Sequence, residues 1–422
     1  MKRRRLIAGA GALGLAGCAA PLRPPRRAQV VVVGGGFGGA TAARYVRLLS
    51  QQRIEVVMIE PQAQFIACPG SNAVLGGTRT LDTLTASYDA LTGRHGVTWV
   101  RDTATAIDAG RRTVTLASGA VIGWDKLVLS PGVALMFDEV QGLREAHDDG
   151  RVLQAWKAGP ETLALRRQLE AMPDGGVFAI AIPESPYRCP PGPYERACVV
   201  AAWLRRAKPR SKLLVLDANA DVVSKPALFK AAWRELYPGL VEYRPQHKVI
   251  GVDAARGTLR VELQDDVRAD VMNVLPPMRA GALAVTSGLA NAANRWCRVN
   301  FLDFSSTAAK DVHVLGDAVQ AAPGMPKSAH MANAHAKVAA AAIVAELSGL
   351  APDPHPMLTN TCYSFVDEAS AIHVASVHEY VAAEATFKPV AGAGGVSAQR
   401  NEAEGAYADA WARNIRADTL GA

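Results

Sequence analysis

The stretch QVVVVGGGFGGATAARYVRLL, residues 29–49, constrains the fold of this chain more than any other. It joins a β-branched run to an amphipathic helical pattern through a turn in which Gly34, Gly36 and Gly39 have the spacing G-x-G-x-x-G. Glycines at these positions allow a tight turn and let a pyrophosphate approach the helix N-terminus. The next apolar run, IEVVMIE, ends in Glu60, whose carboxylate can hold a ribose hydroxyl. The pattern predicts a dinucleotide-binding domain.

Two later strings indicate that this dinucleotide is FAD. KLVLSPG and VHVLGDA read as buried strands that run into turns, in positions that resemble those of flavoproteins with two dinucleotide domains. Asp317, in the second string, is therefore the candidate for contact with the flavin ribityl chain. The string MPKSAHMANAHAKVAAAAIVAEL predicts a long helix with Pro326 near its first turn. Lys327 would add positive charge beside the flavin, and the alternative for it is a solvated lysine at a helix start.

A second β-α-β pattern follows, but its turn is of another kind. The strands GGVFAIAIP and KLLVLDA flank the helical string YERACVVAAWLRRA, as expected for a nicotinamide-binding domain. The loop after the first of these strands is ESPYRCPPGPYE instead of a glycine motif. Proline has no N–H to donate to phosphate, and its ring blocks close approach. We therefore expect that this domain has lost its nucleotide and that NAD(P)H is not a donor.

The whole chain of 422 residues is too long for one ordinary core. The predicted fold is α/β, with two Rossmann-like dinucleotide-binding domains of the disulfide-reductase type and a smaller α+β C-terminal interface domain, in which AIHVASVHEYV suggests a strand. Its basic residues beyond the N-terminus are scattered, which argues against a nucleic-acid partner. The predicted units are an export signal and linker (1–28), a discontinuous FAD domain (29–142 and 282–350), a degenerate NAD-like domain (143–281) and the C-terminal domain (351–422).

The N-terminus MKRRRLIAGAGALGLAGCAA reads as an export signal. A basic start precedes an apolar run that is too short to span a bilayer and that ends in small residues. The arginine pair suggests the twin-arginine route, with an ordinary secretory signal as the alternative. LAGC also resembles a lipoprotein cleavage site, which would make Cys18 a lipid anchor. Either way we expect a periplasmic protein, and no transmembrane helix is predicted.

Five further cysteines bear on the chemistry. No C-x-x-C or H-E-x-x-H occurs, so no compact zinc site and no other metal site is expected. Cys189 and Cys362 lie in turn-like segments of different units, and an exported protein can keep disulfides. From the residues alone, this pair is either a redox disulfide beside the flavin or a static link between domains. Cys198 and Cys297 read as buried free thiols.

At this point the residues match a known family. The strings VVVVGGGFGGATAARYV, FIACPGSN, YRCPPGPYERA, VLGDA, MPKSA and NTCYSF together resemble the flavoprotein subunit of flavocytochrome c sulfide dehydrogenase. The resemblance runs from about residue 29 to the C-terminal YADAWARNIRADTLG. It implies a periplasmic, FAD-dependent enzyme that oxidises hydrosulfide and passes electrons to a separate c-type cytochrome subunit. Because the chain has no C-x-x-C-H, any haem would be on that partner.

The resemblance also implies roles for single residues. Cys189 and Cys362 would form the redox disulfide, with Cys362 nearer the flavin, and Cys68 would attach covalently to the flavin 8α-methyl group. Trp411 would lie near the flavin, although core packing is the alternative for it. Glu195 could take the substrate proton or could be a first-turn carboxylate that the helix dipole stabilises. Arg188 and Lys327 could attract anionic hydrosulfide.

Two rival functions remain open on the sequence. A sulfide:quinone oxidoreductase has a similar fold and cysteine pair but donates electrons to membrane quinone, and a lipidated Cys18 would favour it. A non-catalytic, cytochrome-binding flavoprotein scaffold is the other. The presence of Cys68, Cys189, Cys362 and Asp317 together favours an enzyme over a scaffold.

Overall fold

A computed structural model describes residues 27–421, and its first sheet is the one that the glycine motif predicts. Five of its seven strands pair in parallel, and two short strands extend one edge in antiparallel fashion. This is the sheet of a dinucleotide-binding domain. Across the sheet the strands are β19 (Val299–Asn300), β20 (Ser305–Ser306), β21 (Val312–Val314), β9 (Lys126–Leu129), β1 (Gln29–Val33), β2 (Glu55–Ile59) and β5 (Thr98–Val100).

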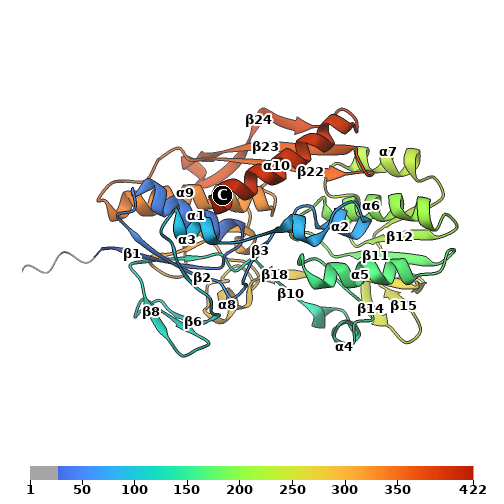
Figure 1. Cartoon of the computed structure of the whole chain (residues 1–422), viewed down its shortest axis with the longest axis horizontal. Coiled ribbons are helices and arrows are strands. Elements are labelled where there is room, and N and C mark those ends of the chain that lie inside the picture. Colours follow the sequence, from blue (N-terminus) through green and yellow to red (C-terminus); the bar gives the residue numbers. More distant parts are fainter. Residues whose placement is uncertain (1–26, 422) are drawn as a thin grey trace, which may run out of the picture.

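Two helices far apart in the sequence pack together on this domain. They are α1 (Phe37–Leu49), which follows the glycine turn, and α9 (Ala329–Leu347) (Figure 1). α9 begins later than predicted, because the Ser328 side chain caps it by accepting a hydrogen bond from the Met331 amide at 3.0 Å. Pro326, which was predicted near the first turn, lies two residues before this cap.

Smaller elements complete the FAD domain. Two of them, β3 and α2, carry the chain from the first sheet toward the second domain, where α2 packs against α6 (Figure 1). The smaller elements are β3 (Phe65–Ile66), α2 (Ser71–Gly76), η1 (Leu81–Leu84), β4 (Thr85–Ala86), α3 (Asp89–Gly93), β6 (Ala104–Asp108), β7 (Thr113–Leu116), β8 (Val121–Gly123), α8 (Ala282–Thr286) and η3 (Gly316–Ala318).

The second domain, at the right of Figure 1, is a second Rossmann-like unit. Its four-stranded parallel sheet has the order β13-β12-β11-β17, and α6 connects β11 to β12. The antiparallel pair β10–β18 lies where the chain enters and leaves this domain, close to the expected boundaries at 142/143 and 281/282. The main elements are β10 (Val133–Leu135), α4 (Leu143–Asp148), α5 (Pro160–Ala171), β11 (Val177–Ile182), α6 (Gly192–Ala207), β12 (Lys212–Asp217), α7 (Pro226–Leu236), β13 (Val241–Pro245), β14 (Val249–Asp253), β15 (Thr258–Val261), β16 (Val267–Arg268), β17 (Val271–Val274) and β18 (Met278–Ala280).

The C-terminal domain is a three-stranded antiparallel sheet with one long helix, at the top of Figure 1. The predicted strand AIHVASVHEYV is confirmed as β23. The helix α10 was not predicted. Asn401 caps it by accepting a hydrogen bond from the Glu404 amide at 2.8 Å, and few of its side chains are buried, so its apolar periodicity is weak. The elements are β22 (Met357–Phe365), β23 (Ala371–Val381), β24 (Thr386–Val396) and α10 (Glu402–Leu420).

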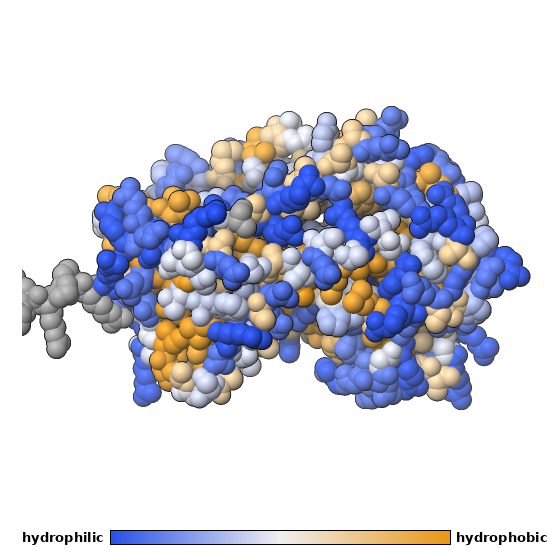
Figure 2. Space-filling view, in the orientation of Figure 1, coloured by the Kyte–Doolittle hydropathy of each residue, from blue (hydrophilic) through white to orange (hydrophobic). Residues whose placement is uncertain are grey.

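The face of the molecule that Figure 2 draws carries both polar and apolar residues. The face drawn in Figure 2 is mainly hydrophilic, with apolar areas scattered among polar ones. Within residues 27–421, no helix combines the length and the apolar character needed to cross a bilayer. The predicted twin-arginine signal and Cys18 lie outside the described residues.

Candidate active site

The glycine turn after β1 has the shape that a dinucleotide needs. Gly34 has a φ of +102°, which favours glycine, and a Cβ on it would overlap the carbonyl of Ser130. A Cβ on Gly39 would overlap the carbonyl of Gly34, so this glycine lets α1 pack closely on the turn. A Cβ on Gly36, at the start of α1, would meet nothing within 4 Å. The open space in front of the helix N-terminus is suited to a pyrophosphate.

Glu60 lies at the end of β2, beside this turn. Its carboxylate accepts hydrogen bonds from the amides of Gly35 at 2.7 Å and Gln62 at 2.8 Å. The Tyr88 hydroxyl donates to the Gly35 carbonyl at 3.1 Å and holds the turn from the other side. Each carboxylate oxygen of Glu60 keeps acceptor capacity for a ribose hydroxyl. This is the position that the sequence predicted for it.

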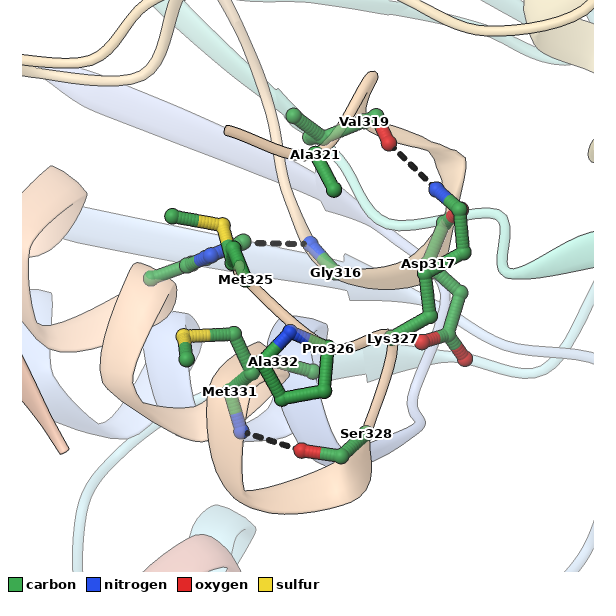
Figure 3. A pocket seen from close by; sticks show the side chains of 11 residues that line it. Gly316, Asp317, Val319, Ala321, Met325, Pro326, Lys327, Ser328, Met331 and Ala332 are labelled. Atoms are coloured by element: carbon green, nitrogen blue, oxygen red, sulfur yellow. Dashed lines mark hydrogen bonds between the residues drawn. The ribbon is translucent and has the colours of Figure 1, made fainter. Parts of the chain in front are cut away.

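Asp317 and Lys327 lie side by side at the edge of a small pocket between η3 and the start of α9 (Figure 3). Oδ1 of Asp317 is buried and has no hydrogen-bond partner among the described residues, and burial raises the pKa of this carboxyl group. An orphaned acceptor of this kind fits a hydroxyl of a flavin ribityl chain. Together with the glycine turn, it shows that the residues present fit FAD.

Lys327 is not the solvated lysine that the sequence left open. It is 5% exposed, and its Nζ donates to the carbonyls of Asp317, at 2.9 Å, and Val319 (Figure 3). The ammonium also lies 3.7 Å from the centre of the Trp296 ring. Burial lowers its pKa to about 8. A cation tied to backbone carbonyls in this way is no entrance for hydrosulfide, and that part of the prediction was wrong.

Cys189 and Cys362 come from different domains and lie within electrostatic reach of each other. Cys189 precedes α6 with a φ of +60°, and its amide donates to the Lys327 carbonyl at 2.8 Å, which fastens the loop to the FAD domain. Cys362 lies in β22, with its Sγ 3.6 Å from Oδ1 of Asn360. Burial raises the pKa of both thiols, and the charge of Cys362 adds to the rise in the pKa of Cys189. The sulfurs are not bonded to each other in this structure.

Glu195, in the first turn of α6, connects three parts of the molecule. Its carboxylate accepts hydrogen bonds from the Phe365 amide at 2.9 Å and from Nδ2 of Asn72 at 2.8 Å. Asn72 is held in turn by Arg196, a buried cation that donates to Oδ1 of Asn72 at 3.0 Å. Burial raises the pKa of Glu195, and these hydrogen bonds oppose the rise. The carboxylate is thus both a first-turn residue and a neighbour of the cysteine pair.

Cys68 lies in the turn between β3 and α2, on the FAD domain. It is partly exposed, and its carbonyl accepts a hydrogen bond from the Ser71 amide at 3.0 Å. Two cations, Arg188 and Lys157, are near enough to feel its charge. Arg188 itself donates to the carbonyl of Trp156. The environment of Cys68 is therefore electropositive.

Trp411 and the remaining cysteines lie elsewhere around the site. Trp411, on α10, is half-buried, with its ring centre 6.0 Å from that of His330 and 6.5 Å from that of Tyr363. His330 belongs to α9, and Tyr363 follows Cys362 in β22. Cys198 and Cys297 are fully buried, as predicted. No cluster of potential metal ligands occurs among residues 27–421.

In the second domain, the acid at the end of β12 is bonded within the protein itself. Asp217 ends β12, as Glu60 ends β2, but it is 0% exposed. Its Oδ2 accepts hydrogen bonds from the hydroxyls of Tyr194 at 2.7 Å and Tyr243 at 3.0 Å. Tyr187, from the proline-rich loop, packs behind them with its hydroxyl 3.4 Å from that of Tyr194. The loss of the nucleotide stays a prediction from the prolines, and the contacts of these tyrosines were not predicted.

Sequence reasoning also missed Lys225, Asn72 and Arg196. Each is buried, and each binds groups more than a hundred residues away in the sequence. Of the three, Lys225 has a feature that can be seen in the sequence, because it precedes a proline. In the structure its φ of +56° is rare for a residue with a side chain.

Fold and site together define a flavin-dependent oxidoreductase of the two-dinucleotide-domain class. The model of the pyridine nucleotide-disulphide oxidoreductases matches residues 28–164. Residues 162–276 match the central part of the flavoprotein chain of sulfide dehydrogenase (flavocytochrome c), and residues 354–420 match the flavin-binding part of flavocytochrome c sulphide dehydrogenase.

Single proteins agree with these matches. The sulfide dehydrogenase (flavocytochrome c) flavoprotein chain of Chlorobaculum thiosulfatiphilum is 56% identical over 46 residues, which are 11% of this chain and 94% of that sequence. The chain therefore belongs to the flavocytochrome c sulfide dehydrogenase flavoprotein family.

More distant relatives share the fold over longer stretches. The mitochondrial sulfide:quinone oxidoreductase of Dictyostelium discoideum is 25% identical over 304 residues, 68% of this chain. That match covers 65% of the Dictyostelium protein, so the chain spans slightly less than two thirds of its length. The crystal structure of the Aquifex aeolicus sulfide:quinone oxidoreductase has a TM-score of 0.74 at 19% identity and covers 94% of this chain and 93% of its own. This last likeness concerns the fold.

Proposed function

We propose that the protein oxidises hydrosulfide through a Cys189–Cys362 disulfide beside FAD and passes the electrons one at a time to a c-type cytochrome subunit. One observation supports the proposal: Cys189 and Cys362, from two different domains, lie within electrostatic reach of each other, and the Cys189 amide is hydrogen-bonded to the Lys327 carbonyl beside the pocket that fits FAD. Membership in the sulfide dehydrogenase family supports the choice of substrate.

The protein's own groups account for the first step. Hydrosulfide attacks Sγ of Cys189 and breaks the S–S bond, which forms a persulfide on Cys189 and releases Cys362 as a thiolate. Glu195, held by Phe365 and Asn72, is placed to accept the substrate proton. When FAD is bound, it supplies a two-electron acceptor that can release electrons singly.

The acceptor separates the two candidate enzymes. Sulfide:quinone oxidoreductase is the second candidate, and the Dictyostelium relative favours it. Purified, FAD-loaded protein should lose its flavin absorbance when sulfide is added without oxygen. The reduced protein should then reduce cytochrome c faster than it reduces a short-chain quinone. The reverse order of rates would establish the quinone enzyme, and a flavin that sulfide does not bleach would leave only the scaffold.

The predicted leader supports a periplasmic location and export by the twin-arginine route, with Cys18 as a possible lipid anchor in the same segment. Replacing Arg3, Arg4 and Arg5 with lysine should stop export of the full chain. Export that continues after this change would point to the ordinary secretory route. Mass measurement of the mature N-terminus decides whether Cys18 is retained and lipidated.

A further inference from the structure

Lys225 combines two features that are costly for a protein to maintain. It sits immediately before α7 with a φ of +56°, in the left-handed region that residues with side chains seldom adopt. It is also only 6% exposed, although lysine is among the residues least often buried. Backbone strain and a buried charge at one position point to a role beyond packing.

The ammonium group of Lys225 is held against β22. Its Nζ donates hydrogen bonds to Oγ of Ser364 at 2.9 Å, to the carbonyl of Cys362 at 3.1 Å and to the carbonyl of Ile372 at 3.5 Å. Ser364 and Cys362 are two residues apart in a strand, so their side chains project from the same face. A cation that binds the Ser364 hydroxyl therefore lies on the face from which the Cys362 sulfur projects.

All of these acceptors are neutral. Among residues 27–421, no carboxylate lies within ion-pair distance of Lys225. A buried charge without a partner is unfavourable, so the ammonium needs an opposite charge nearby. The groups whose negative charge it would feel are, from strongest to weakest, Cys362, Glu195, Cys189 and Glu404.

Lys225 and Cys362 each shift the pKa of the other. Burial lowers the pKa of Lys225 to about 8, and the charge of Cys362 is the first of the effects that oppose this. Burial likewise raises the pKa of the Cys362 thiol, and Lys225 is the first of the groups that lower it. The partner that the ammonium lacks is thus the sulfur of Cys362 in its thiolate form.

We propose that Lys225 is a positioning residue whose buried ammonium holds Cys362 as a thiolate when the disulfide opens. The idea rests on the proposed function, in which hydrosulfide attacks Cys189. In that step an S–S bond forms on Cys189, the Cys189–Cys362 bond breaks, and its electron pair leaves with Cys362. Exchange is faster when the leaving thiol has a lower pKa. Lys225 would therefore speed the opening and keep Cys362 charged for the next transfer.

The test measures Cys362 itself and needs no sulfide. In the FAD-loaded full chain with the Cys189–Cys362 pair reduced, the rate of Cys362 alkylation by iodoacetamide is followed against pH by peptide mass spectrometry. Because an opposite charge nearby shifts a pKa by about one unit or more, Lys225→Met should slow alkylation of Cys362 roughly tenfold below its midpoint pH. Lys225→Arg should retain most of the wild-type rate.

Two further variants make the result decisive. Lys225→Gln removes the charge but keeps N–H donors for Ser364 and Cys362, and it carries the test if Lys225→Met fails to fold. Lys230→Met is the matched control, because Lys230 lies on the same helix in an exposed ion pair with Asp221 at 2.6 Å. A Lys225→Gln protein with the wild-type alkylation profile would overturn the proposal. A wild-type protein that does not oxidise sulfide would overturn only the proposed function.

Discussion

In the first dinucleotide domain the turn between strand and helix is made of glycines, whereas the corresponding turn of the second domain holds prolines and Cys189. The acids at the ends of the next strands differ in the same way. Within residues 27–421, the carboxylate of Glu60 accepts only from backbone amides, while the carboxylate of Asp217 accepts from two tyrosine hydroxyls. One domain keeps its polar groups available for a ligand, and the other satisfies them internally.

The comparison shows that two Rossmann-like units of one chain share an architecture although their strand-to-helix turns differ. The parallel sheet and α6 pack against each other through buried apolar side chains, so their packing does not depend on a bound nucleotide. Once phosphate no longer has to approach the turn, prolines are tolerated there, and they restrict the backbone around Cys189. In the second domain this turn carries Cys189, whose amide is hydrogen-bonded to the FAD domain.

The largest expected effect comes from the cysteine pair. Cys189→Ser and Cys362→Ser should each keep the fold and FAD, yet lose sulfide-dependent cytochrome reduction by on the order of a thousandfold, as when one member of a nucleophilic unit is removed. Cys198→Ala, a buried thiol on α6, is the matched control and should keep its turnover. Full activity in Cys189→Ser would make the pair a structural link.

The next prediction compares the two domains as binding sites. Stopped-flow mixing should show fast flavin reduction by sulfide and no saturable reduction by NADH or NADPH. The reason is that Pro190, Pro191 and Pro193 offer no N–H groups and that Asp217 is already bonded to Tyr194 and Tyr243. Rapid reduction by micromolar NADH would show that the second domain still binds a nucleotide.

A third prediction concerns how firmly the first domain holds its cofactor. Acid-denatured wild-type protein should stay yellow, because a thioether from Cys68 to the flavin survives unfolding. Cys68→Ala should release free FAD on denaturation, yet bind FAD while folded, since the glycine turn and Glu60 are untouched. The measurement is the absorbance of the pellet and of the supernatant. Colour that leaves the wild-type pellet would refute the covalent bond.

The sequence predicted those features that depend on neighbouring residues. The glycine spacing, the β-branched runs and the prolines each act locally, so the two Rossmann-like units and the altered turn could be predicted. Lys225, by contrast, acts on Cys362 across 137 residues, and Asn72 acts on Glu195 across 123. Nothing in the local sequence says which distant strand a buried lysine or asparagine will meet. Capping by Ser328, likewise, could not be distinguished from a start at Pro326.

The smallest expected effect tests whether Asp217 now serves the fold. Burial raises the pKa of Tyr194, so its hydroxyl stays a donor, and Tyr194→Phe removes one of the two tyrosine hydrogen bonds to Oδ2 of Asp217. Leaving a buried carboxylate oxygen less satisfied costs about 1 kcal/mol or more, and Tyr243 and Asn219 still bond to the carboxylate.

Thermal unfolding should therefore show an apparent Tm lower by roughly 2–4 °C for Tyr194→Phe. The matched control is Tyr407→Phe, because Tyr407 is exposed on α10 and its variant should unfold as the wild type does. If Asp217 still bound the ribose of a nucleotide, NADH would raise the Tm of the wild type, and Tyr194→Phe would bind NADH more tightly. An unchanged Tm in Tyr194→Phe, or stabilisation of the wild type by NADH, would contradict the prediction that Asp217, unlike Glu60, serves the fold.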